Sequence, residues 1–259
     1  MINVRGALGT QVIELLAALA RLAENGEKIE NRSSGWRPSS YGLSRETSSA
    51  IPQAPAWFIN INAGGDVVDT VREDYLSQLI CNVSCTVDLN GTKKTGGWNV
   101  EDFRLIKKHN AAICDALVFR NMNNSVYLKE LIHVRGKDRQ LISTNTYIKM
   151  YDKLRLPVIG DDPHIIDIMT YEDNYIGHVH RRMGIDYTAA QDWMTVLNAD
   201  VVHCSISSFV ISALLLDPMK EAHIIRPTEG APHKVSSHVV DAVEFLAQEW
   251  PNVTFDEFK

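Results

Sequence analysis

The chain has 259 residues, of which 45% are hydrophobic, so it can bury one large core or two smaller ones. Its net charge of −6 argues against a protein that wraps nucleic acid by broad electrostatic attraction. No apolar run is long enough to cross a bilayer, and an apparent strand directly after Met1 leaves no room for a signal peptide, so we expect a complete cytoplasmic protein without a membrane span. The cysteines are scattered in apolar surroundings, which favours reduced core thiols over disulfides or zinc ligands: Cys81, Cys85, Cys114 and Cys204.

The first turn of the chain has a pattern found at phosphate sites. The end of a short strand at 3–5 leads into Gly6-Ala7-Leu8-Gly9, and Thr10 is predicted to cap a helix that runs to about Glu24, with Gly26 just past its end. This geometry points backbone N–H groups at an anion or sugar, although it also suits a plain turn at the edge of a core. The spacing is G-x-x-G, so the G-x-G-x-x-G dinucleotide fingerprint is not met, and the chain has no P-loop.

The rest of the first 125 residues is predicted to be α/β around a long loop. Residues 30–55 are rich in serine and proline and have no hydrophobic period, as in a surface loop that is either flexible or contacts an acceptor. The predicted elements are strands at 57–62 and 82–89 and helices at 66–80 and 99–116, the last opened by Asn99. A polar stretch at 121–125 ends this part, so we place a domain boundary after Ser125.

From residue 126 onward, buried strands alternate regularly with amphipathic helices. Strands are predicted at 126–134, 156–160, 175–180, 200–204 and 222–226, and helices at 145–155, 163–171, 188–198 and 208–216. This order is typical of a doubly wound parallel sheet, whose ligand site lies at the carboxyl ends of the strands. The last segment, 236–259, has apolar residues at helical spacing from Ser236 to about Glu249 and is predicted to pack back on the body.

Polar residues gather where the predicted strands end. They are His133 and Arg135 to Asp138, Gly160 to Asp162, His178 and His180, and Ser205, Ser207 and Ser208. The surrounding excess of basic residues between Lys129 and Arg155 suits a phosphate-bearing ligand. His178 and His180 would face the same side of a strand, but no third ligand with suitable spacing stands nearby, so we expect no metal site.

Several segments together resemble a known glycosyltransferase family. His133-Val134-Arg135-Gly136-Lys137-Asp138 resembles the H-x-R-x-x-D motif of the fucosyltransferase superfamily with a GT-B type fold, which includes α-1,2-, α-1,6- and protein O-fucosyltransferases. Gly6-Ala7-Leu8-Gly9-Thr10-Gln11 resembles the G-G-L-G-N-Q turn of the α-1,2 branch, and residues 205–213 resemble its S-x-F-S-x-W-A stretch. Residues 158–162 are similar to the family's strand ending in S-D-D, and 190–197 to the helix before the serine loop.

The resemblance implies an α/β, GT-B-like protein with two Rossmann-like domains. Residues 1–125 would form the acceptor side, and residues 126–235 would bind the nucleotide-sugar. Arg135 would stabilise the departing pyrophosphate, because a planar guanidinium matches phosphate oxygens without a metal; a structural ion pair with Asp138 is the alternative. Asp138 is the carboxylate available as a general base in the same loop, or else it holds Arg135 in place.

The other candidate residues each have a structural interpretation as well. Ser207 and Ser208 would bind a phosphate at a helix amino end or only cap that helix, and Asp161 and Asp162 would recognise a base or ribose or only form a turn. Asp192 fits a helix surface, although its family counterpart lies near the nucleotide. The predicted donor-nucleotide residues are His133, Arg135, Lys137, Asp161, Asp162, Asp192, Ser205, Ser207 and Ser208, and the donor sugar or phosphate loop is Gly6, Ala7, Leu8, Gly9 and Thr10.

The sequence therefore predicts a metal-independent, inverting glycosyltransferase. It would move a sugar from GDP-fucose or a related nucleotide-diphospho-sugar, used as a co-substrate, to a hydroxyl of a carbohydrate or another acceptor. Two alternatives stay open. One is transfer from a UDP-sugar to a hydroxylated DNA base, as some viral enzymes do, although the acidic composition counts against duplex binding. The other is a nucleotide-binding module without turnover, which would suit Ala7 and Thr10 in the turn and the lack of a tryptophan after the serine loop.

Overall fold

The computed structural model describes residues 8–26, 99–117, 127–136, 139–171 and 188–258. The chain divides into two compact units, Met1–Asn121 (unit 1) and Met122–Lys259 (unit 2). The division and the boundary expected after Ser125 both fall in residues 118–126, outside the described ranges. The Ser-rich loop, the elements expected between 57 and 89, and the strand expected at 175–180 also lie outside them.

In unit 1 the described residues form three helices, α1 (Leu8–Glu24), α5 (Val100–Lys108) and α6 (Asn110–Ala116), and α1 contacts both others. The helix expected over 99–116 is thus broken at His109, whose backbone leaves helical geometry at φ −107° and ψ 15°. Asn99 caps α5 as predicted, since its side chain accepts the Asp102 N–H at 2.8 Å. The buried Asp102 carboxylate also pairs with Arg21, which ties α1 to α5.

The expected start of α1 is wrong, although its end is confirmed. The helix begins at Leu8, so Gly9 and Thr10 lie inside its first turn, and Thr10 is not the capping residue. A capping preference is a weak signal compared with the packing of a whole apolar helix, and α1 buries almost every residue from Val12 to Ala20. Gly26 follows the helix with φ +75°, the left-handed geometry that glycine adopts easily.

Unit 2 is built on one parallel sheet. Its described strands are β1 (Glu130–Val134), β2 (Val158–Gly160), β3 (Val201–Ser205), β4 (Glu221–Ile225) and β5 (Val253–Asp256). They are ordered β2-β1-β3-β4-β5, and every neighbouring pair is parallel. The helices are α7 (Thr144–Leu154), α8 (Pro163–Met169), α9 (Thr188–Asn198), α10 (Ser208–Leu216) and α11 (Ser237–Glu249).

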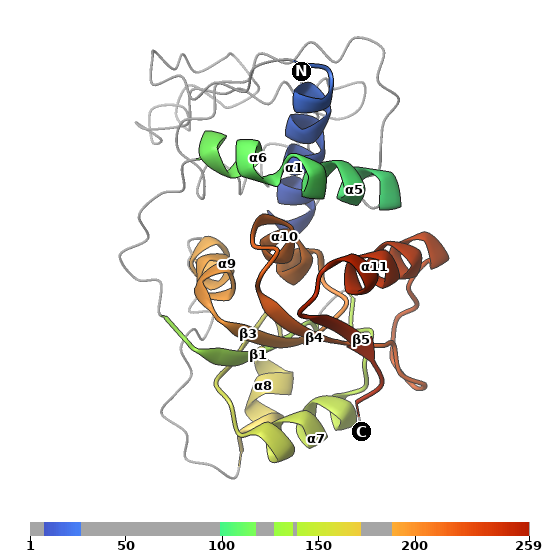
Figure 1. Cartoon of the computed structure of the whole chain (residues 1–259). Helices are drawn as coiled ribbons and strands as arrows, with labels where there is room; N and C mark the ends of the chain where they lie inside the picture. The colour runs from blue at the N-terminus through green and yellow to red at the C-terminus, as the bar shows by residue number, and fades with distance from the viewer. Residues whose placement is uncertain (1–7, 27–98, 118–126, 137–138, 172–187, 259) are drawn as a thin grey trace, which may run out of the picture. The chain divides into compact units, whose positions relative to one another are not determined.

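The helices cover both faces of this sheet. Figure 1 shows α7 and α8 on one face and α9, α10 and α11 on the other. The predicted α/β class and doubly wound parallel sheet are therefore confirmed, and the strand order is one of the common doubly wound orders. The bounds of α9 and α10 agree with the predicted ranges, because both helices have long apolar patterns between clear turn signals.

The end of the chain contributes a strand that the sequence analysis did not predict. After α11, Trp250 is buried and donates its indole N–H to the Leu214 carbonyl at 3.2 Å. Residues Val253–Asp256 then pair with β4 as β5. Only Val253 and Phe255 point into the core, and two alternating apolar residues are too few to identify a strand from sequence.

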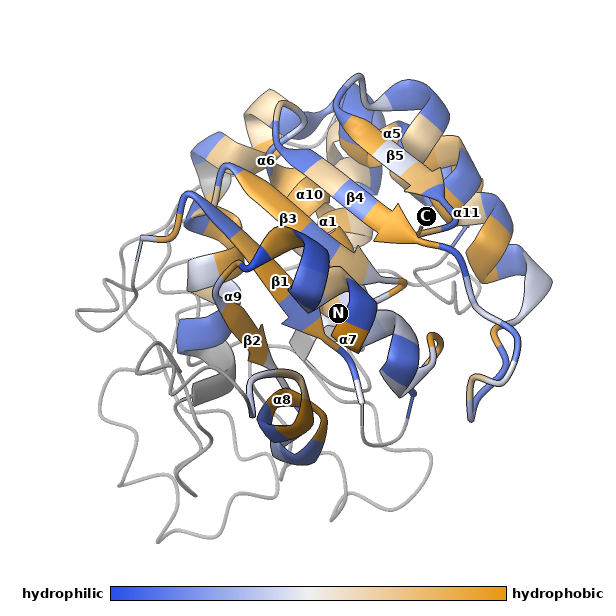
Figure 2. Ribbon diagram, turned by 90° about the horizontal axis from the view of Figure 1, so that it is seen from below, coloured by the Kyte–Doolittle hydropathy of each residue, from blue (hydrophilic) through white to orange (hydrophobic). Residues whose placement is uncertain are grey.

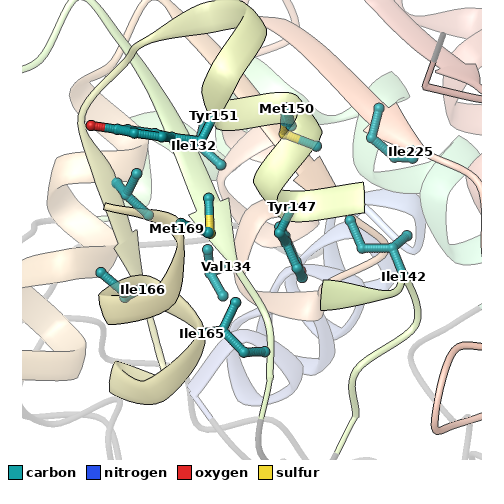
Figure 3. Packing of buried hydrophobic residues seen from close by; sticks show 11 residues of the cluster. Ile132, Val134, Ile142, Tyr147, Met150, Tyr151, Ile165, Ile166, Met169 and Ile225 are labelled. Carbon is teal, nitrogen blue, oxygen red and sulfur yellow. The ribbon is translucent and has the colours of Figure 1, made fainter. Parts of the chain in front are cut away.

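An apolar cluster fills the space between the sheet and the α7–α8 layer. Figure 3 shows it at close range, with Tyr147 and Met150 reaching inward from α7 and Ile165 from α8. Its members are Ile132, Val134, Ile142, Tyr147, Met150, Tyr151, Val158, Ile165, Ile166, Met169 and Ile225. Figure 2 shows this side of unit 2 from below, where strands β1 and β2 are largely apolar and α7 is mainly polar. The packing fixes β1 and β2 relative to α7, and so fixes where these two strands end.

Candidate functional site

The chain order of the sheet reverses between β1 and β3. The chain leaves β1 to form β2 on one side, whereas β3, β4 and β5 extend the sheet on the other side (Figure 1). The β1–β3 ladder runs from Glu130 opposite Val201 to His133 opposite Cys204. In doubly wound sheets, ligands bind outside the carboxyl ends of the strands at such a switch point. The residues just past this ladder are therefore the candidate site.

Arg135 and Asp161 form an ion pair where β1 and β2 end. Nη1 of Arg135 donates to Oδ2 of Asp161 at 2.8 Å, and the two side chains are only 17% and 10% exposed. The Gly136 N–H donates to Oδ1 of the same carboxylate at 2.6 Å. Asp161 is thus an observed partner of Arg135, and Asp138, the partner in the alternative interpretation of Arg135, lies with Lys137 outside the described residues.

Asp162 caps the helix that follows β2. Its Oδ1 accepts the N–H groups of His164 and Ile165 at 3.0 and 3.2 Å, and Pro163 occupies the first turn of α8. A Cβ atom on Gly136 would overlap the Asp162 side chain, so a glycine is needed at this close approach. The contacts of both aspartates therefore agree with the structural interpretation of this pair, and base or ribose recognition stays a prediction.

His133 is a packed strand residue that lies against the first turn of α10. Its ring stacks on Phe209 with centroids 5.2 Å apart and an interplanar angle of 17°. The residue is 3% exposed, and among the described residues its Nδ1 has no hydrogen-bond partner. Burial, and secondly the Arg135 charge, lower the pKa of His133 to about 3, so the ring is neutral at physiological pH.

The serine loop connects β3 to α10. Ser205 ends β3 and is fully buried, and Ser208 is the first residue of α10. Ser207 occupies the N-cap position, but its side chain makes no capping bond, so the capping interpretation is wrong for Ser207. Its Oγ is buried and, within the described part of the chain, finds no hydrogen-bond partner. A helix amino end also presents N–H groups that lack intrahelical acceptors, which suits a negatively charged ligand.

Tyr147 links the end of β1 to the end of β3, and the sequence did not predict this role. Its hydroxyl accepts the Arg135 N–H at 2.8 Å and lies 3.2 Å from the Ser205 Oγ. Burial raises the pKa of Tyr147, so the hydroxyl keeps its proton. In sequence, a tyrosine at helical spacing from Met150 and Tyr151 reads only as core, and no local signal distinguishes it.

The loop between β1 and α7 is also held from the β4 side. The Ser143 N–H donates to Thr228 Oγ1 at 2.8 Å, and the Thr228 N–H donates to the Leu141 carbonyl at 3.1 Å. Gln140 donates its N–H to His233 Nδ1 at 3.1 Å and accepts the His233 N–H at 3.2 Å. These contacts join residues more than 80 positions apart, so the sequence gives no sign of them.

The remaining predicted residues are Asp192 and the loop from Gly6 to Thr10. Asp192 is buried in α9, so its placement on a helix surface is wrong. Leu8, Gly9 and Thr10 belong to α1 of unit 1, while Gly6 and Ala7 lie outside the described residues, and the role of this loop stays a prediction.

The described ranges contain no group of three or more His, Cys, Asp or Glu side chains able to hold a metal ion, and His178 and His180 lie outside these ranges. None of the helices described is both long and apolar enough to cross a membrane. Cys204 is a buried thiol outside any disulfide, as predicted, whereas the Cys114 thiol also forms no disulfide but is exposed.

Comparisons with protein-family models, with curated proteins and with solved structures found no match to this chain. The resemblance to GT-B fucosyltransferases therefore depends on the motifs quoted above.

Proposed function

We propose that the protein is a cytoplasmic glycosyltransferase that moves a sugar from a nucleotide-diphospho-sugar, GDP-fucose or a related donor, to an acceptor hydroxyl. In this proposal unit 2 binds the donor nucleotide, and unit 1 forms the acceptor side of a GT-B-like pair of domains. The transfer inverts the anomeric centre and uses no metal, because a guanidinium supplies the positive charge at the leaving group.

One observation carries the proposal: two buried polar atoms at the switch point have no hydrogen-bond partner among the described residues. They are Nδ1 of His133 and Oγ of Ser207. An unsatisfied buried polar group costs about 1–3 kcal/mol, so proteins rarely keep one without a purpose. A ligand that hydrogen-bonds both atoms would remove this cost, and the site lies where doubly wound sheets bind their ligands.

The surrounding groups favour a negatively charged ligand. Arg135 holds its guanidinium at the end of β1, and the amino end of α10 follows Ser207 directly. Phosphate oxygens accept hydrogen bonds from both kinds of donor. His133 is neutral, so it would contribute a hydrogen bond and not a charge. A diphosphate spanning Arg135 and the serine loop satisfies these groups together.

The chemistry follows from that placement. The acceptor oxygen attacks the anomeric carbon as the bond from that carbon to the β-phosphate oxygen breaks, and the electron pair remains on the departing nucleoside diphosphate. Arg135 stabilises the growing negative charge on the diphosphate. The acceptor proton passes to a general base, and we assign this role to Asp138, in the same loop as Arg135.

A donor screen followed by a transfer assay tests the proposal. The melting temperature is measured with GDP, UDP, ADP, CMP and dTDP compounds, because a ligand that binds only the folded state raises it. The winning nucleotide's labelled sugar donor is then incubated with carbohydrate acceptors and with duplex DNA carrying a hydroxylated base. We expect the wild type to transfer the labelled sugar to a carbohydrate, and Arg135→Ala to lose this transfer while it keeps its fold. Normal turnover by Arg135→Ala would contradict the assignment, and label in the DNA would favour the DNA-modifying alternative.

A further inference from the structure

Strands β1 and β3 stop pairing just before the proposed diphosphate site. Their last opposed residues are His133 and Cys204, and the N–H of Arg135 lies beyond this ladder. At the same point the chain turns from β1 toward α7 on one face, and from β3 toward α10 on the other (Figure 1). Some other group must therefore keep the two strand ends at a fixed separation.

The Tyr147 hydroxyl occupies this position. It accepts the Arg135 N–H at 2.8 Å and lies 3.2 Å from both the Arg135 carbonyl and the Ser205 Oγ. One hydroxyl thus contacts the backbone of the residue that carries the guanidinium and the side chain that begins the serine loop. A hydroxyl has one donor and two acceptor sites, so these contacts use its capacity fully.

The ring of Tyr147 is itself held rigidly. Tyr147 is fully buried in the apolar cluster of Figure 3, near Val134 and Ile142. Close packing leaves a buried ring little freedom, so the place of its hydroxyl is set by α7 and not by the loops it contacts. The hydroxyl therefore acts as a fixed point to which both strand ends are attached.

We infer that Tyr147 is a positioning residue that fixes Arg135 relative to the serine loop, so that both can contact one diphosphate. This inference rests on the proposed function. Tyr147 is buried beneath the strand ends and acts through Arg135 and Ser205. Without the hydroxyl, the hydrogen bond from the Arg135 N–H and the link from Arg135 to Ser205 would both be lost, while Asp161 would still hold Arg135 to the end of β2.

Tyr147→Phe in the full chain tests the inference, because it removes only the hydroxyl. Tyr151→Phe is the matched control, since Tyr151 is a buried tyrosine of the same helix one turn further on. The first readout needs no ligand: hydrogen exchange of the Arg135 amide should become at least about tenfold faster in Tyr147→Phe and stay unchanged in Tyr151→Phe. Equal exchange in the wild type and Tyr147→Phe would overturn the inference.

The second readout is the affinity for GDP, or for whichever probe of the donor screen raises the wild-type melting temperature most. Tyr147→Phe should bind it about tenfold more weakly, and Tyr151→Phe like the wild type. Ser205→Ala should weaken binding similarly, and the double variant should bind no more weakly than the worse single variant, because both changes break one link. Fully additive losses, or undiminished affinity in Tyr147→Phe, would overturn the inference.

The two proposals fail in different ways. If no nucleotide binds the wild type, the proposed function fails, and the exchange of the Arg135 amide still decides whether Tyr147 holds the strand ends. If nucleotides bind and are turned over but Tyr147→Phe behaves like the wild type in both readouts, only the inference about Tyr147 fails. If Tyr147→Phe does not fold, Ser205→Ala tests the same link from β3. Unchanged exchange of the Arg135 amide and unchanged nucleotide affinity in Ser205→Ala would overturn the inference.

Discussion

Asp161 holds Arg135 in two ways, because its carboxylate pairs with the guanidinium at 2.8 Å and also accepts the N–H of the next residue, Gly136, at 2.6 Å. The side chain and the backbone of the β1 end are thus fixed by one group at the end of β2. A guanidinium has five N–H donors in a planar fork, so a carboxylate bound to one nitrogen can orient it toward a second anion.

The two adjacent aspartates should respond differently to loss of charge. Asp161→Asn removes a charged partner of the largely buried Arg135, and we expect a loss of about 3 kcal/mol in the free energy of unfolding. Asp162→Asn should cost less than about 1 kcal/mol, because asparagine caps helices as well as aspartate does. Urea unfolding of both variants measures the difference. Equal losses would show that the Arg135–Asp161 pair contributes little.

His133 should make stability depend on pH in acid. The pKa of its buried ring is about 3 in the folded protein, against 6.5 for an unperturbed histidine. The unfolded chain therefore binds a proton first as the pH falls, so stability is complete above about pH 6.5 and is lost as the pH drops toward 3. His133→Phe keeps an aromatic ring against Phe209 but cannot bind this proton. Between pH 6.5 and 4.5 we expect its free energy of unfolding to fall by about 2 kcal/mol less than that of the wild type.

Chemical unfolding of both proteins at several pH values checks this expectation. His203 also titrates with a pKa lowered chiefly by burial, but it is present in both proteins, so the difference between them isolates His133. Parallel pH profiles for the wild type and His133→Phe would contradict the prediction.

Gly136→Ala should disturb the proposed site specifically. The new methyl group would overlap Asp162, which cannot move away without losing its capping bonds to α8. We expect a loss of about 2 kcal/mol in stability together with loss of the nucleotide-induced rise in melting temperature. Gly230→Ala is the control, because Gly230 has φ +79° but open space around it, so alanine there costs about 1 kcal/mol of backbone strain. A Gly136→Ala protein that binds nucleotide normally would rule out this geometry.

Thr228 should stabilise the loop that follows Arg135. Its hydroxyl accepts the Ser143 N–H at the start of α7, and valine has the same shape without that acceptor. We expect Thr228→Val to lose about 1–2 kcal/mol and to speed hydrogen exchange of the Ser143 amide. Thr228→Ser keeps the oxygen and should stay within about 0.5 kcal/mol of the wild type. Identical exchange at Ser143 in both variants would contradict this role.

Local patterns in the sequence were sufficient for most of unit 2. Apolar periodicity between turn signals predicted α9 and α10 with their observed bounds, and the alternation of strands and helices predicted a parallel, doubly wound sheet. The order alone placed Arg135, Asp161 and the serine loop at one edge of the sheet, since parallel strands end on the same side. The helices follow from interactions between residues close together in the chain. The parallel sheet follows because alternating strands and helices allow only a few topologies.

Tertiary structure decided what each of these residues contacts. Strand β5 forms because the edge of β4 is available for pairing and because the buried Trp250 anchors the chain just before it. The four residues of β5 do not contain enough pattern to predict this pairing. Asp161, 26 positions along the chain, was found to pair with Arg135, and Tyr147 proved to connect Arg135 with Ser205. Hydrogen bonds and ion pairs depend on distances of a few tenths of an ångström between groups far apart in sequence, and only the packing of the core sets those distances.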